Sequence, residues 1–279
     1  MYNFDCNGLV LDLTTPAVMG ILNLTGDSFY DGGRYASTTG RLKHVEKMLV
    51  DGASIIDIGA VSTRPGAADI PESLELTTIL AFLDLATKSF PESIFSVDTF
   101  RATVAKAAFE HGAGMINDIY GGRFGEGMLE MIGELGVPYV LMHMKGTPAT
   151  MQVDPQYTDV VAEVAYFFEQ QSIKCRNHGI RHVILDPGFG FGKSIAHNYQ
   201  ILSCLDSFKT DGQPILAGVS RKSMITRVLE INSEDALNGT TILNTIALLK
   251  GADILRVHDV KEASEAIKIV NQLPVPEDY

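Results

Sequence analysis

Polar side chains stand at the ends of several short apolar runs, and their types are those that bind ligands or carry protons. Asp98 follows "IFSV", Asp186 follows "HVIL" and His258 follows "DILRV". Carboxylates, amides and imidazoles are costly to bury without partners, so these positions are candidates for a binding or catalytic site. The same pattern selects Asn23, Asp57, Asp98, Asn117, His143, Asp186, Ser220 and His258, together with Arg256 inside the last run.

Three basic segments are suited to holding an anion. Arg256 and His258 are two residues apart, so on a strand they share a face, and the guanidinium fork matches a phosphate group. The segment "VSTRPG" carries Thr63 and Arg64 on a loop, and "GVSRKSM" places Lys222 shortly after a glycine that lets a ligand approach the backbone. A simple surface charge pair is the alternative for "GVSRKSM".

The segment "DPGFGFGKS" invites comparison with phosphate-binding loops, but it fits neither standard pattern. GxxxxGK[ST] requires glycine where Pro187 stands, and GxGxxG requires glycine where Lys193 stands. The segment is interpreted either as a mobile loop or as a flexible platform that presents Phe191 and Asp186. There is no HExxH motif, and His143 has no second ligand at a useful spacing, so no zinc site is predicted.

The order of elements explains how the polar residues would be brought together. Eight short apolar runs alternate with segments of helical period, and segments such as 102–113 and 160–179 end at or next to glycine. Eight such units predict an α/β protein, a (β/α)8 TIM barrel, whose active site lies at the carboxyl ends of the strands. The alternative, that polar residues merely end strands, is weak for all eight positions at once.

The two ends of the chain are predicted to differ from the barrel. Residues 1–15 contain apolar residues alternating around Asn7 and Gly8, which predicts a β-hairpin that caps one end of the domain. No linker composition divides the chain, so residues 1–279 are predicted to form a single domain. Residues 274–279 are predicted to be a loose tail.

The bulk composition excludes several classes of function. The chain has 279 residues and 46% hydrophobic content, enough for one large core. A net charge of −12 disfavours nucleic acid and anionic membranes as partners, although local Arg and Lys allow a small anionic substrate. The N-terminus lacks the features of a signal peptide, and no apolar run approaches the roughly 20 residues that span a bilayer. Three separated cysteines without a CxxC motif favour a reducing cytosol, so a cytoplasmic location is expected.

The candidate residues divide into two chemical halves. One half suits a flat heterocycle rich in hydrogen-bonding groups, and it contains Asp98, Asn117, Asp186 and Lys222. The other half suits a phosphate or pyrophosphate, and it contains Asn23, Arg64, Arg256 and His258.

The motifs together resemble those of the dihydropteroate synthase family over nearly the whole chain. They are, in order, "MGILNLTGDSFYDGG", "DIGAVSTRPGA", "SVDT", "INDI", "LMHMKGTPATMQ", "DPGFGFGK", "GVSRKS" and "LRVHDV". The resemblance implies a pterin-binding barrel that condenses 6-hydroxymethyl-7,8-dihydropterin pyrophosphate with p-aminobenzoate in folate biosynthesis. Pyrophosphate leaves and 7,8-dihydropteroate forms. The resemblance also implies Mg²⁺ as cofactor, sulfonamides as ligands of the aminobenzoate pocket, and a homodimer.

The resemblance assigns roles to residues. It places the pterin against Asp98, Asn117, Met142, Asp186, Gly218 and Lys222, and the pyrophosphate against Asn23, Thr63, Arg64, Arg256 and His258, with Mg²⁺ on Asn23. It places p-aminobenzoate between Phe29, Pro65, Phe191 and Ser223. Catalytic roles fall to Asp31, Arg64 and Lys222. The loops 24–34 and 60–68 would close over the reacting centre and exclude water from an SN1-like cation.

Two positions depart from the family pattern. Gly26 stands where the family commonly has proline, and Val61 stands where it often has glutamate. Two other functions share part of the pattern. A pterin-dependent methyltransferase would need the pterin residues without the Arg256 and His258 pair, and a catalytically silent pterin-binding barrel would show gaps among the site residues.

Overall fold

The computed structural model describes residues 2–24, 37–61, 70–148, 150–209 and 212–274. The strands of this part are β1 (Asn3–Cys6), β2 (Leu9–Asp12), β3 (Ala17–Asn23), β4 (Ile55–Gly59), β5 (Ile94–Asp98), β6 (Met115–Asp118), β7 (Tyr139–Met142), β8 (Val183–Asp186), β9 (Leu216–Ala217) and β10 (Ile254–Val257). The α-helices are α1 (Thr38–Val50), α2 (Glu72–Ser89), α3 (Ala102–Glu110), α4 (Met128–Leu135), α5 (Val160–Asn177), α6 (Ile195–Ser203), α7 (Ser223–Leu229), α8 (Leu237–Leu249) and α9 (Val260–Val270).

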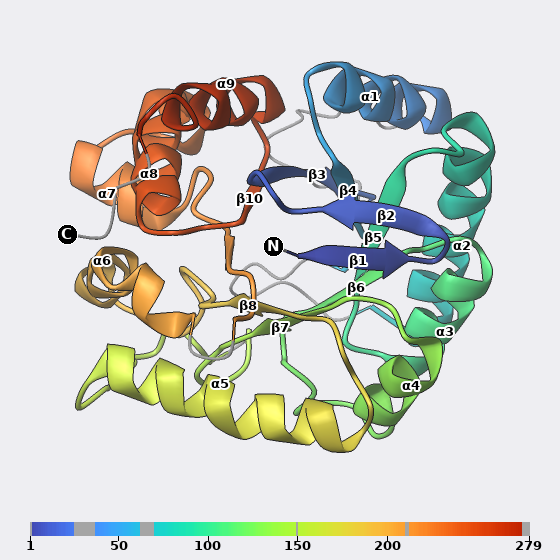
Figure 1. Cartoon of the computed structure of the whole chain (residues 1–279), viewed down its shortest axis with the longest axis horizontal. Coiled ribbons are helices and arrows are strands. Elements are labelled where there is room, and N and C mark those ends of the chain that lie inside the picture. The colour runs from blue at the N-terminus through green and yellow to red at the C-terminus, as the bar shows by residue number, and fades with distance from the viewer. Residues whose placement is uncertain (1, 25–36, 62–69, 149, 210–211, 275–279) are drawn as a thin grey trace.

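Strands β3 to β10 form one parallel sheet in the order β8-β7-β6-β5-β4-β3-β10-β9. A parallel bridge between Leu185 and Ile215 joins the two outer strands, which closes the sheet into a barrel. Helices ring the barrel, as Figure 1 shows. The predicted TIM barrel is therefore confirmed, because short apolar strands that each lead into an amphipathic helix bury both faces of a parallel sheet.

The N-terminal hairpin closes the floor of the barrel. β1 pairs with β2 so that Cys6 lies opposite Leu9, and the two linking residues, Asn7 and Gly8, have φ of 58° and 88°. Both values suit the tight primed turn predicted from the sequence. The inner side chains of the hairpin pack in one cluster with a residue from the start of each barrel strand: Met19, Ile55, Ile94, Met115, Val140, Ile184, Leu216 and Ile254. The floor is thus a dry apolar layer.

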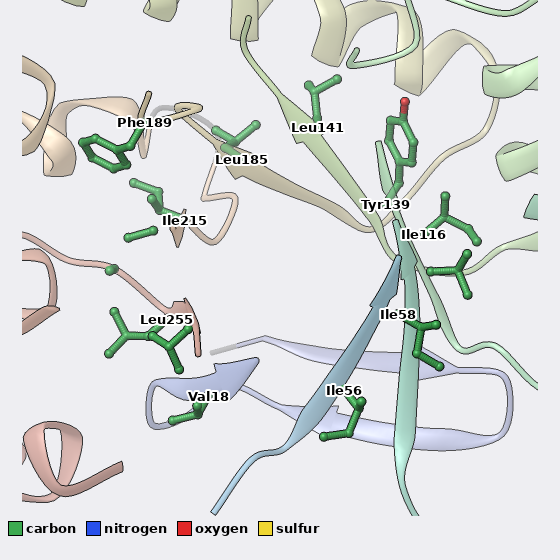
Figure 2. Packing of buried hydrophobic residues seen from close by; sticks show 14 of the residues in the cluster. Val18, Ile56, Ile58, Ile116, Tyr139, Leu141, Leu185, Phe189, Ile215 and Leu255 are labelled. Atoms are coloured by element: carbon green, nitrogen blue, oxygen red, sulfur yellow. The ribbon is translucent and has the colours of Figure 1, made fainter. Parts of the chain in front are cut away.

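The other face of each strand packs against the helices. Val18, Ile56, Tyr139, Leu185 and Leu255 belong to this outer core, and Figure 2 shows their side chains on the strands. Because side chains alternate along a strand, each strand sends every second residue into the barrel. Two residues further along their strands than the floor residues, the inward positions include Asp57, Asn117, Asp186 and Arg256. These polar residues therefore lie in a layer above the apolar floor.

Three strand ends differ from the sequence prediction, and one of them is β9, which ends at Ala217 and not at Ser220. Asp57 and Asn117 were expected at strand termini, but β4 continues to Gly59 and β6 to Asp118. The residues beyond them pair with the neighbouring strands, so the ladder extends further than the apolar run does. Asp57 and Asn117 consequently point into the barrel from within their strands.

The loop after β8 is held by several hydrogen bonds to its backbone. Lys193 Nζ donates to the carbonyls of Gly188 at 2.9 Å and Phe191 at 3.0 Å, and it lies 2.9 Å from Nδ1 of His143. Asn198 accepts from the amide of Gly190 at 2.8 Å. A buried lysine and an asparagine therefore satisfy much of the backbone of this segment, and its mobility stays a prediction.

The predicted tail falls mostly outside the description, since residues 275–279 are not among the described ones. Among the residues that are described, the helices are too short or too polar to cross a bilayer.

Candidate active site

An ion-pair network lies above the floor of the barrel. Arg256 on β10 donates from Nε to Asp57 Oδ2 at 2.7 Å and from Nη2 to Asp98 Oδ2 at 3.0 Å. Asn117 on β6 donates from its side-chain nitrogen to the same Asp57 oxygen at 3.0 Å. These contacts cross the barrel because Arg256, Asp57 and Asn117 occupy inward positions on three separate strands. Asp98 therefore forms an ion pair with Arg256 within the site.

Burial of these carboxylates changes their acidity. Burial raises the pKa of Asp98 to about 7; the charge of Arg256 opposes this increase, and the nearby Asp57 adds to it. Burial also raises the pKa of Asp186 above its ordinary value, against the charge of Lys222 and a hydrogen bond from the amide of Gly188. A carboxyl that titrates near neutral pH at the mouth of a barrel is characteristic of a ligand site.

Lys222 stands beside Asp186 at the carboxyl end of the barrel. Its Nζ donates to the carbonyl of Phe189 at 2.5 Å and lies 4.9 Å from the ring centre of Phe191. Burial lowers its pKa to about 8, with the charge of Asp186 acting in the opposite direction. A side-chain carbon added at Gly218 would lie 3.8 Å from Lys222 Nζ and 3.9 Å from Arg256 Cβ. A side chain at position 218 would therefore begin in ordinary van der Waals contact with both Lys222 and Arg256.

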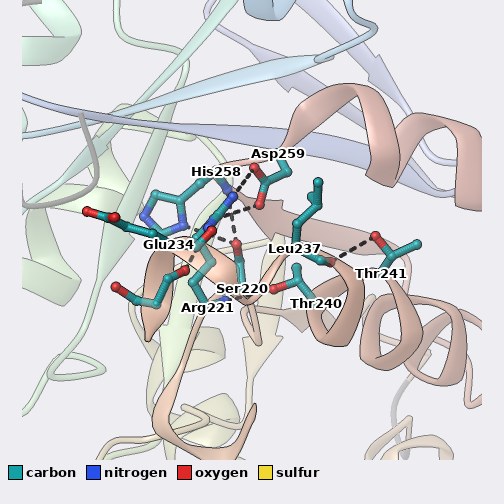
Figure 3. Close-up of polar contacts among 9 residues, drawn as sticks. Ser220, Arg221, Glu234, Leu237, Thr240, Thr241, His258 and Asp259 are labelled. Carbon is teal, nitrogen blue, oxygen red and sulfur yellow. Dashed lines mark hydrogen bonds and ion pairs between the residues drawn. The ribbon is translucent and has the colours of Figure 1, made fainter. Parts of the chain in front are cut away.

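His258 lies beyond the end of β10, next to Ser220. The serine hydroxyl is 3.0 Å from Nδ1 of the imidazole, and the His258 amide donates to the same oxygen at 3.3 Å (Figure 3). Burial lowers the pKa of His258 to about 3, and the charge of Arg256 lowers it further, against Asp259. The imidazole is therefore neutral at pH 7.

The neighbouring Arg221 has a structural role. Its guanidinium pairs with both carboxylate oxygens of Asp259 at 2.9 and 2.8 Å, and it donates to the carbonyls of Ser233 and Glu234. Its backbone has φ of 57°, which is uncommon for a residue with a side chain. Arg221 thus anchors the loop that carries Ser220 and Lys222.

His143 does not join the other candidates. It follows the outward position of Leu141 on β7, and its ring packs at 5.0 Å against Phe167 of α5, with Lys193 at its Nδ1. Burial and the charge of Lys193 lower its pKa to about 2. The prediction that His143 converges with the other strand-end residues is therefore wrong, because the alternation of β7 turns it toward the helices.

The remaining predicted residues fall into two groups. Met142 is buried beside Phe191, and Ser223 is exposed as the first residue of α7, directly after Lys222. Asn23 ends β3, opposite Gly59, where an added side-chain carbon would lie 3.9 Å from Asn23 Oδ1 and 3.8 Å from Asp98 Oδ2. Outside the described residues lie Phe29, Asp31, Thr63, Arg64 and Pro65, with Gly26.

Sequence reasoning gave Asp57 no binding role of its own and missed what Ser220 does. Asp57 is completely buried, and its Oδ1 has no hydrogen-bond partner among the described residues. The available signal was the position of Asp57 inside an apolar run, since a carboxylate is retained there only with partners. For Ser220 no signal was available, because a serine after a strand is ordinary.

Comparison with known proteins identifies the family. The model of the pterin binding enzyme family matches residues 19–258. The dihydropteroate synthase of Escherichia coli K12 is 45% identical over 94% of this chain and 93% of its own length, and that of Haemophilus influenzae is 43% identical over 94% and 96%.

Solved structures agree with this result. The Yersinia pestis dihydropteroate synthase in a sulfonamide drug complex has a TM-score of 0.93 and 42% identity, covering 97% of this chain and 98% of that one. The Xanthomonas albilineans enzyme in complex with 7,8-dihydropteroate has a TM-score of 0.86 and 36% identity, covering 98% and 100%. With the barrel, the polar residues gathered at its carboxyl end and the relatives in agreement, this chain belongs to the pterin-binding enzyme family and, within it, to the dihydropteroate synthases.

Proposed function

We propose that this chain condenses 6-hydroxymethyl-7,8-dihydropterin pyrophosphate with p-aminobenzoate, releasing pyrophosphate and forming 7,8-dihydropteroate in folate biosynthesis. The observation that carries the proposal is the convergence of Asp98, Asn117, Asp186 and Lys222 with Arg256 in one barrel mouth. Relatives support it: the Xanthomonas albilineans dihydropteroate synthase has solved structures with 4-aminobenzoic acid and with 7,8-dihydropteroate.

The residues assigned to pterin recognise the hydrogen-bonding edge of its ring. Asp186 and Asp98 offer carboxylate oxygens, which accept the 2-amino and ring N–H groups of a pterin. Lys222 supplies a donor for the ring oxygen and nitrogen, and Met142 with Gly218 lines the slot. A site built to pair with these polar groups rejects heterocycles that lack them, because its own buried groups would be left without partners.

The pyrophosphate half surrounds the leaving group with donors. Arg256 uses Nε and Nη2 on carboxylates, and its Nη1 has no hydrogen-bond partner among the described residues, so one edge of the guanidinium is available to the leaving group. His258 donates through its imidazole N–H. Asn23, Thr63 and Arg64 complete the set in this proposal. Growing negative charge on the departing oxygen is stabilised by these donors.

The chemistry is a substitution at the methylene carbon. The bond between that carbon and the pyrophosphate oxygen breaks, and the electron pair leaves with pyrophosphate. The electron-rich dihydropterin stabilises the carbon cation, and the negative charge of Asp31 is assigned the same role in this proposal. The amine of p-aminobenzoate then forms the new C–N bond and loses a proton. Phe29, Pro65, Phe191 and Ser223 border the aminobenzoate, while Arg64 and Lys222 orient the reacting groups.

Mg²⁺ fits the oxygen donors of this site. No cluster of three His, Cys, Asp or Glu side chains suited to a metal occurs in the described part of the chain. Asn23 nevertheless offers an amide oxygen near Asp98 at the strand ends, and Mg²⁺ is commonly held by one or two protein oxygens plus substrate phosphates. Bound there, it would neutralise charge on the pyrophosphate.

The activity is tested by pyrophosphate release. The purified protein is incubated with the dihydropterin pyrophosphate and p-aminobenzoate, and both pyrophosphate and dihydropteroate are measured. Equal amounts of the two products are expected, together with competition by a sulfonamide against p-aminobenzoate. Release of pyrophosphate without dihydropteroate contradicts the proposal, and so does the absence of turnover by the purified protein.

We also propose that two copies associate through α7 and α8. Val228, Leu229, Ile242 and Leu249 are exposed apolar residues of these neighbouring helices, and Ile242 and Leu249 are seven residues apart on one face of α8. Sedimentation should show a dimer that Ile242→Glu dissociates, while Val10→Glu on the hairpin has no effect.

The three cysteines are free, which supports the expected cytoplasmic location.

A further inference from the structure

Side chains continue the pairing of β9 and β10 after the backbone ladder ends. The ladder joins Ile254 to Leu216 and Leu255 to Ala217, and β9 is two residues long. Beyond it, Ser220 bonds to His258 and Arg221 bonds to Asp259, so two successive residues of one loop hold two successive residues of the other (Figure 3). The position of the His258 ring is therefore set by this pair of contacts and not by the strand.

The hydroxyl of Ser220 has a defined direction. Its oxygen accepts from the backbone amide of His258 at 3.3 Å, and a hydroxyl carries one proton of its own. Ser220 is 4% exposed, and among the described residues the acceptor within reach of that proton is Nδ1 of His258, at 3.0 Å. This geometry favours Nδ1 as the acceptor, which leaves Nε2 to carry the ring proton of a neutral imidazole.

The charges around His258 favour its neutral form. Arg256 on its own strand, and Arg221 and Lys222 on the neighbouring loop, are cations, and Asp259 is the opposing carboxylate. Arg221 already holds both oxygens of Asp259, at 2.9 and 2.8 Å. Burial among three cations lowers the pKa of His258 to about 3, so a second ring proton is unfavourable at pH 7.

We propose that Ser220 is a positioning residue that holds His258 as the neutral tautomer protonated at Nε2. His258 then serves pyrophosphate as a directed hydrogen-bond donor, and it does not act as a cation or as a general acid. This inference rests on the proposed function for the assignment of His258 to the leaving group.

Nitrogen NMR of the imidazole tests the tautomer without any need for turnover. Full-length protein labelled with ¹⁵N-histidine is measured from pH 5 to pH 8, and the His258 signals are assigned by their loss in His258→Gln. One unprotonated nitrogen at Nδ1 and one protonated nitrogen at Nε2 are expected throughout. Ser220→Thr should keep this pattern, and Ser220→Ala should give a mixture of tautomers. A protonated Nδ1 or an imidazolium in the wild type at pH 7 overturns the proposal.

Kinetics test the consequence for the leaving group. Loss of one positioned hydrogen bond corresponds to about a tenfold fall in kcat/KM for the dihydropterin pyrophosphate in Ser220→Ala. Affinity for 6-hydroxymethylpterin, which lacks pyrophosphate, should be unchanged, and Ser220→Thr should restore the rate to within about twofold. Ser220→Ala with wild-type kinetics and an unaltered tautomer refutes the role. A wild-type protein without synthase activity overturns the proposed function, while the NMR result still decides the tautomer.

Discussion

Replacing Arg256 by methionine separates what the ion-pair network does from what the leaving group needs. Arg256→Met keeps much of the apolar stem of the side chain and removes the guanidinium. Asp57 loses a donor at 2.7 Å and Asp98 loses one at 3.0 Å. From sequence, Arg256 was expected to act on pyrophosphate more than on pterin. The structure predicts that both are weakened, because Asp98 is the partner of Arg256 and belongs to the pterin half.

The size of the effect follows from the contact with Asp98. A hydrogen bond to a charged group contributes about 1.5–3 kcal/mol, so loss of the charged acceptor that Asp98 offers to pterin corresponds to about a 10- to 160-fold loss of pterin affinity at pH 7. The charge of Arg256 holds the pKa of Asp98 down, at about 7, against burial. Without Arg256 that pKa rises further, so Asp98 is protonated at pH 7 and is a poorer acceptor. Affinity should then recover as the pH is raised and the carboxylate forms again.

Calorimetry with 6-hydroxymethylpterin between pH 6 and pH 9 measures this. Wild-type affinity should rise from pH 6 to pH 8, and the affinity of Arg256→Met should rise over a higher interval. Arg256→Lys, which keeps the charge without the fork, should lie between the two. Arg181→Met, an exposed arginine outside the network, is the matched control. Unchanged pterin affinity in Arg256→Met, or a loss that is the same at every pH, would refute the reasoning.

Further predictions concern single groups. Asp98→Ala or Asp186→Ala should abolish measurable pterin binding in the same calorimetric assay. Because burial raises the pKa of Asp98 from 3.8 to about 7, the folded state binds a proton between these values and this carboxylate costs stability above pH 7. Asp98→Asn should therefore raise Tm relative to wild type more at pH 8 than at pH 5, and equal shifts would contradict it. EDTA should suppress turnover and Mg²⁺ should restore it, whereas full activity after rigorous metal removal would exclude the role given to Asn23. Lys193→Met should lower Tm by about 5–10 °C, since buried carbonyls lose their donor, and raise the KM for p-aminobenzoate, with exposed Lys261→Met as control.

The sequence alone determined the architecture, because the barrel follows from local pattern. Each strand is an apolar run, each helix has its own periodicity, and helix α5 ends at Asn177, two residues before Gly179 at φ of 78°. Eight repeats of one unit leave few other ways to bury the sheet on both faces. The hairpin turn was equally local, since Asn7 and Gly8 are residues that favour positive φ.

The candidate site was predicted as a set of residues but not as a set of contacts. The carboxyl ends of parallel strands meet whatever lies between them in sequence, so Asp98, Asn117 and Asp186 were expected together. The pairing of Arg256 with Asp57, 199 residues away, depends on the order in which β10 and β4 flank β3, and on which residues of each strand face inward. A shift of one residue reverses that choice, which is how His143 came to face α5.

Only the tertiary structure determines the pKa shifts of the site and the contacts that hold the loop after β8. The sequence shows a lysine after a glycine-rich segment, but Lys193 became the anchor of that loop only because β7 brings His143 beside it. It shows a histidine, whose charge at pH 7 depends on burial and on cations from β10 and the loop after β9. Desolvation and charge act over distances in space, so residue types and spacing are insufficient to determine them, whereas strand and helix periodicity acts between neighbours and can be read along the chain.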